Sequence, residues 1–520
     1  MIQLKSSNFT SLVTAIFLGV GTIIGSGWLF ASYYASKEAG GASILSWIVG
    51  AVLALLLALL LAEIATMFPV RGIFARLLVV SHNRDLGFVI AISNWVGALI
   101  IIPSEASATI QYVSTVFPKV TPYIFQNHEF TVIGLLLVSV LILTYTIINY
   151  WGIKSLSKFN NAITTFKVII PLFTAIVILI SSFHSSNFTH YHSTFMPYGV
   201  SSIFSTVVTS GIFYAFFGFQ LIVLFASELK NPKKNIPISL ISCIVLCLVI
   251  YLLLQIAFIG ALPGDIISKG WAGMNFTSPL AQLASMLGLN FLMVILYLDA
   301  CVSPSGTGIV YLGGASRMLT GMAEDKQIPK FFYNIHPIYN FSRRSLLFTM
   351  VFCLIVVWFF RNWQSIMILV TVFQLLSCVA VPIAFYKLRY SHPDKERPFK
   401  MKGGLTICVI TYLVITYLLI QAGFKAVLAN IILHVACFAI YGVIYHRHDV
   451  RGQIRSWLSS WSIFLYLLFS VVWTYMYDKI NHRILTSPLG LIIFIIISLG
   501  IFTAIIKQKS YNDKDTGYSF

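Results

Sequence analysis

The feature that most constrains this chain is a series of uninterrupted apolar runs of about 20 residues. Two of them cover residues 44–67 and 238–262, and the second contains no charged residue. As helices, such runs are long enough to cross a hydrocarbon core roughly 30 Å thick. Of the 520 residues, 58% are hydrophobic and only 10% are charged, which excludes an ordinary soluble protein. The sequence therefore predicts an all-α integral membrane protein and excludes a barrel of short alternating strands.

The apolar runs predict fourteen spans. They are centred near residues 24, 55, 100, 140, 170, 214, 250, 295, 352, 373, 413, 434, 468 and 496. With the N-terminus inside, all but seven of the 34 lysines and arginines fall on or beside one side of the membrane. The seven exceptions are Lys37, Lys119, Lys269, Arg361, Lys425, Lys479 and Arg483. This asymmetry predicts a multi-pass protein of the cell (plasma or inner) membrane with both termini in the cytoplasm. The net charge of +18 then reflects topology and attraction to an anionic lipid bilayer, not a nucleic-acid partner.

Two spans carry glycines where a membrane helix can least afford to lose backbone hydrogen bonds. The first contains "GVGTIIGSGWLF" (19–30), and the sixth contains "SGIFYAFFGFQLIVLF" (210–225), with Gly211 and Gly218 beside a cluster of aromatic residues. The two interrupted spans are five spans apart. Because five is an odd number, a five-span unit that starts on the inside of the membrane is followed by a unit that starts on the outside. Two such units form an inverted repeat. We therefore expect a 5+5 transporter core with broken helices 1 and 6 and four C-terminal helices.

The domain boundaries follow from this organisation. We expect a cytoplasmic N-terminus at 1–10, the core at 11–390, a cytoplasmic loop at 391–403, peripheral spans at 404–507 and a cytoplasmic tail at 508–520. In lipid, unwound backbone is tolerated only where it lines a cavity. The exposed N–H groups of a half-helix suit a carboxylate and freed carbonyls suit an ammonium, so the breaks indicate a zwitterionic amino acid as substrate. The alternative is that these glycines only allow close helix packing.

The same residues resemble the amino acid-polyamine-organocation superfamily of permeases. The matching segments are "GVGTIIGSGWLF" (19–30), "AEIATMFP" (62–69), "NNAITTFKVIIPLF" (160–173), "FYAFFGF" (213–219), "SELKNPKKNIP" (227–237) and "SRMLTGMAEDKQIPKFF" (316–332). A narrower similarity is to bacterial permeases that include aspartate/glutamate:proton symporters. It rests on "GSGWLF" (25–30), "IPSEASATIQYVS" (102–114) and "YLDACVSPSGTG" (297–308).

The resemblance implies a set of substrate-binding positions. The backbone N–H groups of Gly25, Ser26 and Gly27 would meet the substrate carboxylate. Carbonyls near Phe213, Tyr214 and Ala215, next to the break at Gly218, would meet its ammonium, and Tyr214 lies where related permeases place an aromatic gate. The alternative for these aromatic residues is ordinary packing against lipid or protein.

Ionisable residues within the spans are costly, at least about 2.5 kcal/mol each near the bilayer centre, and so indicate function. Lys167 matches the lysine that replaces the sodium ion in proton-coupled relatives. The hypothesis is that it is protonated when facing outward, bridges span 5 to span 1, and loses its proton to the cytoplasm. The alternative is a lysine whose stem carries the amine to the membrane surface. Glu105 and Asp299 could bind a substrate amine, relay a proton or pair with a neighbouring helix.

The remaining charged residues and the cysteines say less about the function. Glu63 and Glu228 lie near cytoplasmic helix ends, where we expect solvated or interfacial ion pairs. The basic residues beside them are Arg71, Lys230, Lys233 and Lys234. The seven cysteines all lie in apolar runs and are expected to pack as small apolar side chains. The sequence contains no HExxH motif, paired catalytic aspartates or Ser/His arrangement, so it predicts neither an enzyme nor a cofactor or metal site.

The function predicted from the sequence is secondary active transport of an amino acid by proton-coupled symport and alternating access, with acidic amino acids as the candidate class. One alternative is an amino acid/polyamine exchanger of the same superfamily. Another, in a different class, is a proton-translocating subunit of a respiratory complex, which would need charged residues across the membrane midplane but no repeat-related glycine breaks. The sequence leaves the oligomeric state open.

Overall fold

The computed structural model describes residues 11–68, 73–151, 156–189, 191–224, 229–336, 341–445, 450–480 and 487–508. The two expected tails therefore lie almost wholly outside the described residues. The described chain is nearly all helical. Its α-helices are α1 (Leu12–Ile23), α2 (Gly27–Ala39), α3 (Ser43–Met67), α4 (Ile73–Ser81), α5 (Arg84–Ser114), α6 (Thr121–Ile124), α7 (Val132–Tyr150), α8 (Leu156–Ser181), α9 (Val200–Thr209), α10 (Ile212–Phe216), α11 (Leu221–Leu224), α12 (Pro232–Ala261), α13 (Gly264–Ser268), α14 (Pro279–Met286), α15 (Asn290–Glu324), α16 (Arg343–Phe359), α17 (Trp363–Ser391), α18 (Gly404–Ile420), α19 (Phe424–Tyr445), α20 (Val450–Tyr475) and α22 (Pro488–Lys507).

The only sheet in the described part of the chain is a small hairpin that the sequence does not predict. Strands β1 (Phe125–Gln126) and β2 (Glu129–Phe130) pair antiparallel between α6 and α7. The two turn residues, Asn127 and His128, both have positive φ angles, as a two-residue hairpin turn requires. The hairpin caps the start of α7 and plays no part in the site described below.

Each predicted span centre falls within a helix or, for the first, at a helix break. By length and hydropathy, ten helices among the described residues could cross a membrane, or eleven if one bent pair counts as a span. Helices α1 and α18 are apolar but shorter, and α16 has 17 residues. The all-α membrane fold is confirmed, and the number fourteen stays a prediction.

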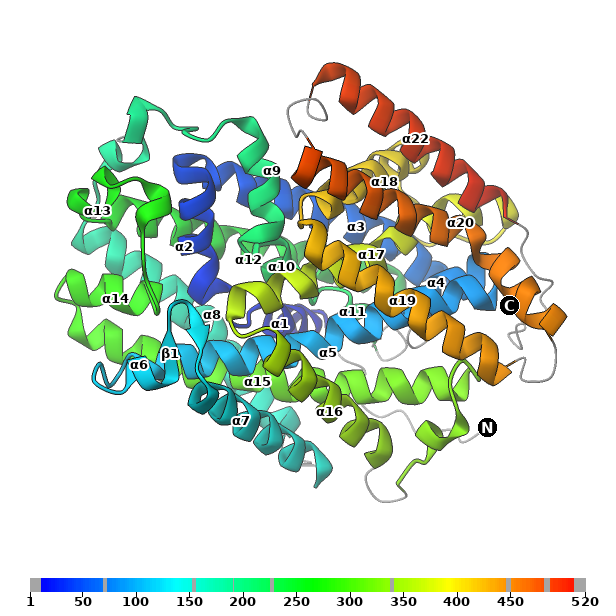
Figure 1. Ribbon diagram of the computed structural model, residues 1–520, viewed down its shortest axis with the longest axis horizontal. Helices are drawn as coiled ribbons and strands as arrows, with labels where there is room; N and C mark the ends of the chain where they lie inside the picture. Colours follow the sequence, from blue (N-terminus) through cyan, green and yellow to red (C-terminus); the bar gives the residue numbers. More distant parts are fainter. Residues whose placement is uncertain are drawn as a thin grey trace.

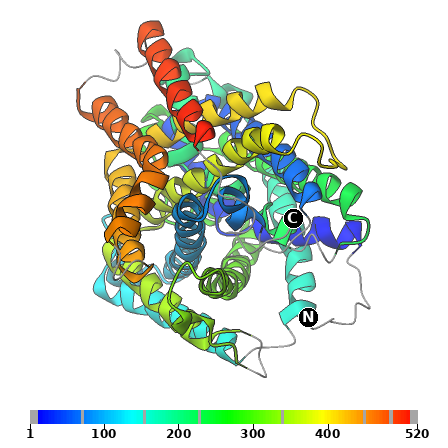
Figure 2. The ribbon, with the colours of Figure 1, turned by 90° about the vertical axis from the view of Figure 1, so that its right-hand side faces the viewer.

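Helices α5 and α17 form the centre of the molecule (Figure 1). The most apolar part of α5 is 100% buried within the protein and that of α17 is 94% buried. Both helices pack against each other, and α5 also lies along α15. The helices drawn in orange and red, α19, α20 and α22, lie on one flank in both views (Figures 1 and 2). The site described below is built from helices of the first 391 residues.

The first span is broken at Ile24–Ser26, between α1 and α2. Helix α1 ends at an extended residue, Ile24, and α2 restarts at Gly27. The sixth span is broken at Gly211, which has a φ angle of 89°, and the segments on either side of it are bent by 57°. A second interruption follows at Gly218. The two breaks that the glycines predict are thus both present.

Two prolines inside long helices free a carbonyl each, and each carbonyl finds a side-chain donor. Pro103 of α5 leaves the carbonyl of Leu99 free, and the thiol of Cys353 lies 3.6 Å from it. Pro304 of α15 leaves the carbonyl of Ala300 free, and the hydroxyl of Thr109 donates to it at 3.0 Å. These contacts fix α5 against α16 and α15 close to the two buried carboxyl groups.

Candidate functional site

The break in the first span presents its backbone to a carboxylate from α5. The N–H of Ser26 donates to Oε2 of Glu105 at 2.8 Å, and both residues are buried. Ser26 immediately precedes α2, so the carboxylate lies at the positive end of that helix. Gly25 permits this approach, because a Cβ placed there would lie 2.4 Å from Oε1 of Glu105. The Ser26 N–H at the break is therefore already bonded to a carboxyl group of the protein itself.

Tyr214 of the sixth span meets the same carboxylate. Its hydroxyl donates to Oε1 of Glu105 at 2.6 Å and lies 3.2 Å from the hydroxyl of Ser26. Ser104, next to Glu105 on α5, donates to the Tyr214 hydroxyl at 3.3 Å. The structure thus brings Ser26, Glu105 and Tyr214 into one hydrogen-bonded cluster, with Gly25 packed against it, and the cluster joins both broken spans to α5.

Trp363, the first residue of α17, covers one side of this cluster. The sequence analysis did not identify it as a site residue. Its indole N–H donates to the Ser26 hydroxyl at 3.0 Å. Its ring stacks on Phe30 at 4.6 Å and on Tyr34 at 5.7 Å, and it meets Tyr214 edge-on at 6.0 Å. Trp363 is completely buried. The site is therefore sealed on this side by aromatic rings rather than by a helix.

The remaining predicted positions of the sixth span pack close to the first. Gly27 faces Ala215, whose Cβ would lie 3.0 Å from a Cβ at Gly27. The carbonyl of Ala215 already accepts a hydrogen bond from Tyr251 at 2.9 Å, which leaves it one further lone pair. Phe213 is buried and contacts the ring of Phe217. These contacts pack the start of α2 against α10.

Lys167 connects three helices. Its ammonium, on α8, donates to the carbonyl of Gly21 at 3.0 Å and to the hydroxyl of Thr307 on α15 at 2.5 Å. Gly21 lies in the last turn of α1, where carbonyls have no partner within the helix. Only 3% of Lys167 is exposed, so its amine stays inside the protein instead of reaching the membrane surface. The bridge from span 5 to span 1 is present.

Asp299 of α15 is buried a few turns away from Thr307. The Ser303 hydroxyl donates to its Oδ1 at 2.6 Å. Its Oδ2 is buried and has no hydrogen-bond partner among the described residues. Both carboxyl groups, Glu105 and Asp299, lie within electrostatic range of the Lys167 ammonium. An unsatisfied buried oxygen beside a cation is a place where a proton or a water molecule can be held.

Glu63 forms ion pairs, as expected, but it is buried in the protein and not solvated. Only 2% of Glu63 is exposed, and it pairs with Arg389 at 2.7 Å and with Arg397 at 3.3 Å. The N–H of Met401 also donates to it at 2.8 Å. Arg389 lies in the last turn of α17, and Arg397 and Met401 follow that helix in the chain. Arg71 and Glu228 lie outside the described residues. The network closes the protein on the side away from Trp363.

The opposite side carries a second polar bridge. Gln364 of α17 donates to Glu38 of α2 at 3.3 Å and to the carbonyl of Thr209 of α9 at 3.2 Å. The Thr209 hydroxyl also bonds to Glu38. This bridge ties α2 of the first span and α9 of the sixth span to α17. With both sides closed, the cluster around Glu105 is enclosed by protein.

Gly218 allows a separate test of the contact between the two broken spans. Its φ angle is 127°, and an added Cβ would lie 2.6 Å from the backbone oxygen of Thr22. Gly288 also has a positive φ angle, 72°, but nothing lies within 4 Å of its missing Cβ. We expect Gly218→Ala to abolish amino acid uptake, because the added Cβ would force the backbone of the sixth span away from the backbone of α1.

The matched control is Gly288→Ala, which adds only backbone strain of about 1 kcal/mol and should keep its uptake. Uptake by each variant is measured in proteoliposomes, after size-exclusion chromatography has confirmed that it is folded. Equal uptake by the two variants would show that the close approach of Gly218 to α1 is not needed.

Two broken helices that enclose a buried polar site, with a closing network on each side, define this protein as a secondary transporter of the inverted-repeat class. The amino acid permease family matches residues 11–432, and the chain belongs to this family. The resemblance seen in the sequence is confirmed, and the protein is a transporter rather than an enzyme. The subunit of a respiratory complex is set aside.

Two relatives are similar in sequence to this chain over most of its length. The glutamate/serine transporter AimA of Bacillus subtilis is 38% identical over 463 residues, which cover 88% of this chain and 86% of AimA. The aspartate-proton symporter of the same organism is 31% identical over 510 residues, 96% of each chain. A manganese transporter of Eremococcus coleocola has a TM-score of 0.54 at 14% identity, covering 92% of this chain and 99% of that one, and shares the fold.

Proposed function

We propose that this amino acid permease is a proton-coupled symporter that works by alternating access, with both termini in the cytoplasm. Acidic amino acids are the proposed substrate class, and serine is a second candidate. The names of two relatives, a glutamate/serine transporter and an aspartate-proton symporter, support this proposal. The alternative of exchange without a net proton is distinguished by the experiment below.

The observation that carries the proposal is the hydrogen bond from the Ser26 N–H to Glu105. A substrate carboxylate needs the N–H groups at the start of α2, and the Glu105 carboxylate competes for them. Protonation of Glu105 removes its negative charge and weakens its hold on Ser26, since hydrogen bonds to charged groups are the stronger ones. Proton uptake and substrate binding therefore favour each other at one place in the structure.

Lys167 completes the cycle. Facing outward, it is charged and holds α1 through Gly21, while Glu105 takes up a proton and the substrate carboxylate takes the N–H of Ser26. After the protein opens inward and the substrate leaves, Lys167 releases a proton to the cytoplasm. Glu105 then passes its own proton to Lys167 and returns to Ser26 as a carboxylate. One proton crosses the membrane per cycle, and the two groups titrate as a pair.

The location of Lys167 supports sodium-independent coupling. Its ammonium lies between α1, α8 and α15, bonded to a free carbonyl of one helix and a hydroxyl of another. Carbonyl and hydroxyl oxygens of this kind also suit a sodium ion, and the ammonium supplies the positive charge there instead.

The test is reconstitution of the full chain in liposomes with radiolabelled glutamate, aspartate, serine and lysine, with an inward proton gradient imposed or absent. We expect accumulation of an acidic amino acid or serine only with the gradient, no effect of replacing sodium by choline, and no uptake of lysine. Equal uptake with and without the gradient, together with dependence on internal amino acid, would identify an exchanger and contradict the proposal.

A further inference from the structure

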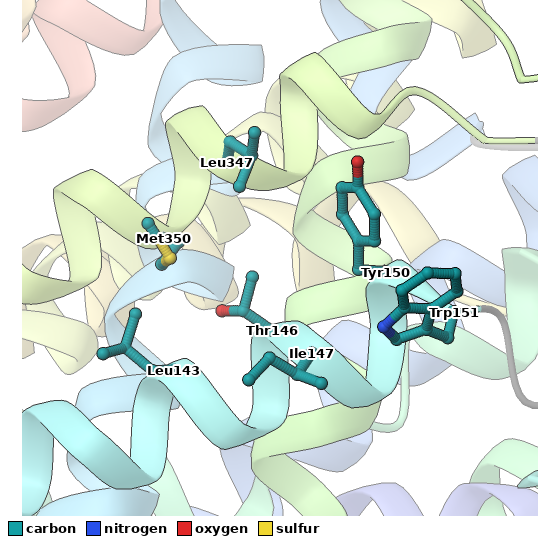
Figure 3. Close-up of a pocket in the computed structure, with 7 residues that line it drawn as sticks. All are labelled: Leu143, Thr146, Ile147, Tyr150, Trp151, Leu347 and Met350. Atoms are coloured by element: carbon teal, nitrogen blue, oxygen red, sulfur yellow. The ribbon is translucent and has the colours of Figure 1, made fainter.

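The surface between α7 and α16 is grooved. Figure 3 shows Leu143, Thr146, Ile147 and Tyr150 from α7 facing Leu347 and Met350 from α16 across a cavity, with Trp151 at one end. Apart from the hydroxyls of Thr146 and Tyr150 and the indole N–H of Trp151, the lining is apolar. The groove belongs neither to the break in the first span nor to the break in the sixth, and the transport cycle described above does not use it.

The groove opens onto the lipid-facing side of the protein. Exposed apolar residues recur along α7 at the spacing of one helix face, at Val140, Leu143, Ile147 and Trp151. Ile147 and Trp151 are 59% and 62% exposed. On α16, Leu347 and Val351 are exposed in the same way. An apolar face of this kind within membrane-spanning helices is covered by acyl chains.

The length of the groove along α7 is close to the thickness of one leaflet. From Leu143 to Trp151 the helix rises by about 12 Å, close to half of the roughly 30 Å hydrocarbon core. Tyr150 and Trp151 close one end, and such aromatic pairs mark the level of the lipid headgroups. An acyl chain that enters the groove from a headgroup at this end would run along its whole length.

The end marked by Tyr150 and Trp151 is strongly basic. The guanidinium carbon of Arg343, at the start of α16, lies 4.0 Å from the centre of the Tyr150 ring and 6.0 Å from that of Trp151. The guanidinium of the neighbouring Arg344 lies over Phe331 at 4.6 Å. Residues 326–350 contain four basic side chains and no Asp or Glu. The apolar groove thus ends at a positive headgroup region.

We propose that the groove between α7 and α16 is a binding site for one anionic phospholipid, with an acyl chain between the helices and the phosphate on Arg343 and Arg344. The stacked position of Arg343 on Tyr150 holds its guanidinium at headgroup level, where it can bind a phosphate through two parallel N–H groups. Under the topology proposed above, this end faces the cytoplasm, where anionic lipids are enriched.

The test is native mass spectrometry of the full-length protein with phosphatidylglycerol or phosphatidylcholine of the same acyl chains. We expect the wild type to retain phosphatidylglycerol preferentially, and Arg343→Gln and Arg344→Gln each to lower this preference about fivefold. Arg361→Gln is the matched control, because Arg361 lies just beyond the other end of α16 and is exposed. It should leave the preference unchanged.

A second measurement separates lipid binding from folding. Leu347→Trp keeps both arginines but fills the groove, and it should lower retention of both lipids while the unfolding temperature in detergent stays near that of the wild type. A wild type without lipid preference, or an Arg343→Gln variant that keeps it, would overturn the proposal. So would a Leu347→Trp variant that changes the oligomeric state and keeps its lipid, since the groove would then be a protein interface.

Discussion

Replacing Lys167 by alanine is expected to abolish amino acid accumulation driven by a proton gradient. The alanine removes the donor to Gly21 and to Thr307 and leaves Glu105 and Asp299 without their cation. A gradient of one pH unit supplies about 1.4 kcal/mol, or about tenfold accumulation for one proton per substrate, and the variant should show none. Uptake in proteoliposomes with the gradient imposed and collapsed measures this directly.

Lys167→Arg separates charge from proton release. Arginine keeps the positive charge but does not lose its proton in proteins, so this variant should bind substrate and yet fail to accumulate it. Substrate binding is measured by the shift in unfolding temperature on adding the amino acid. If either variant accumulates substrate with the pH dependence of the wild type, Lys167 has no part in coupling.

The membrane fold could be predicted because the bilayer allows few solutions. Every apolar run long enough to cross must be a helix, and a glycine-rich interruption within one must line protein or a cavity. This reasoning placed the breaks within residues 19–30 and 210–225, and the structure has them at 24–26 and at Gly211 and Gly218. It could not count spans reliably, since α1 and α18 are shorter than a membrane crossing and helix tilt is set by packing rather than by length.

The site could be predicted only in part, because its contacts join residues far apart in the chain. Glu105 and Lys167 were identified as buried charges, which are rare enough within a span to be informative. Their partners Ser26 and Tyr214 were expected from the resemblance, but Trp363 and Thr307 carry no such signal. Trp363 bonds to Ser26 across 337 positions, and in the sequence it looks like any tryptophan at a membrane interface. Thr307 is one of many hydroxyl residues in the spans.

The error at Glu63 has the same origin. Its partners were sought among basic residues near in sequence, and the structure supplies Arg389, 326 positions away, from the end of α17. The competition that we propose between Glu105 and a substrate for Ser26 was also beyond sequence reasoning, which left three roles open for Glu105. A backbone N–H that can donate either to a side chain or to a ligand is recognised only in three dimensions.

Glu105→Gln is expected to remove the pH dependence of substrate affinity. Glutamate accepts from Ser26 with one oxygen and from Tyr214 with the other. Glutamine has one acceptor oxygen and an NH₂ that cannot accept, so it must release one of these donors and so resembles protonated glutamate. In the wild type, affinity should fall as the external pH rises and Glu105 becomes charged. The difference between a charged and a neutral hydrogen bond, about 1.4 kcal/mol, corresponds to about a tenfold change in KM.

The measurement is KM for uptake at external pH values from acidic to alkaline, with the gradient clamped by an ionophore. Glu105→Gln should give one KM across the range, near the acidic value of the wild type. Glu38→Gln is the control, because Glu38 is a carboxyl that also accepts from a hydroxyl but lies in the bridge to Gln364, away from Ser26. It should keep the wild-type pH dependence. If Glu105→Gln instead retains that dependence, the carboxylate on Ser26 does not compete with the substrate, and the link between proton and amino acid must lie elsewhere in the protein.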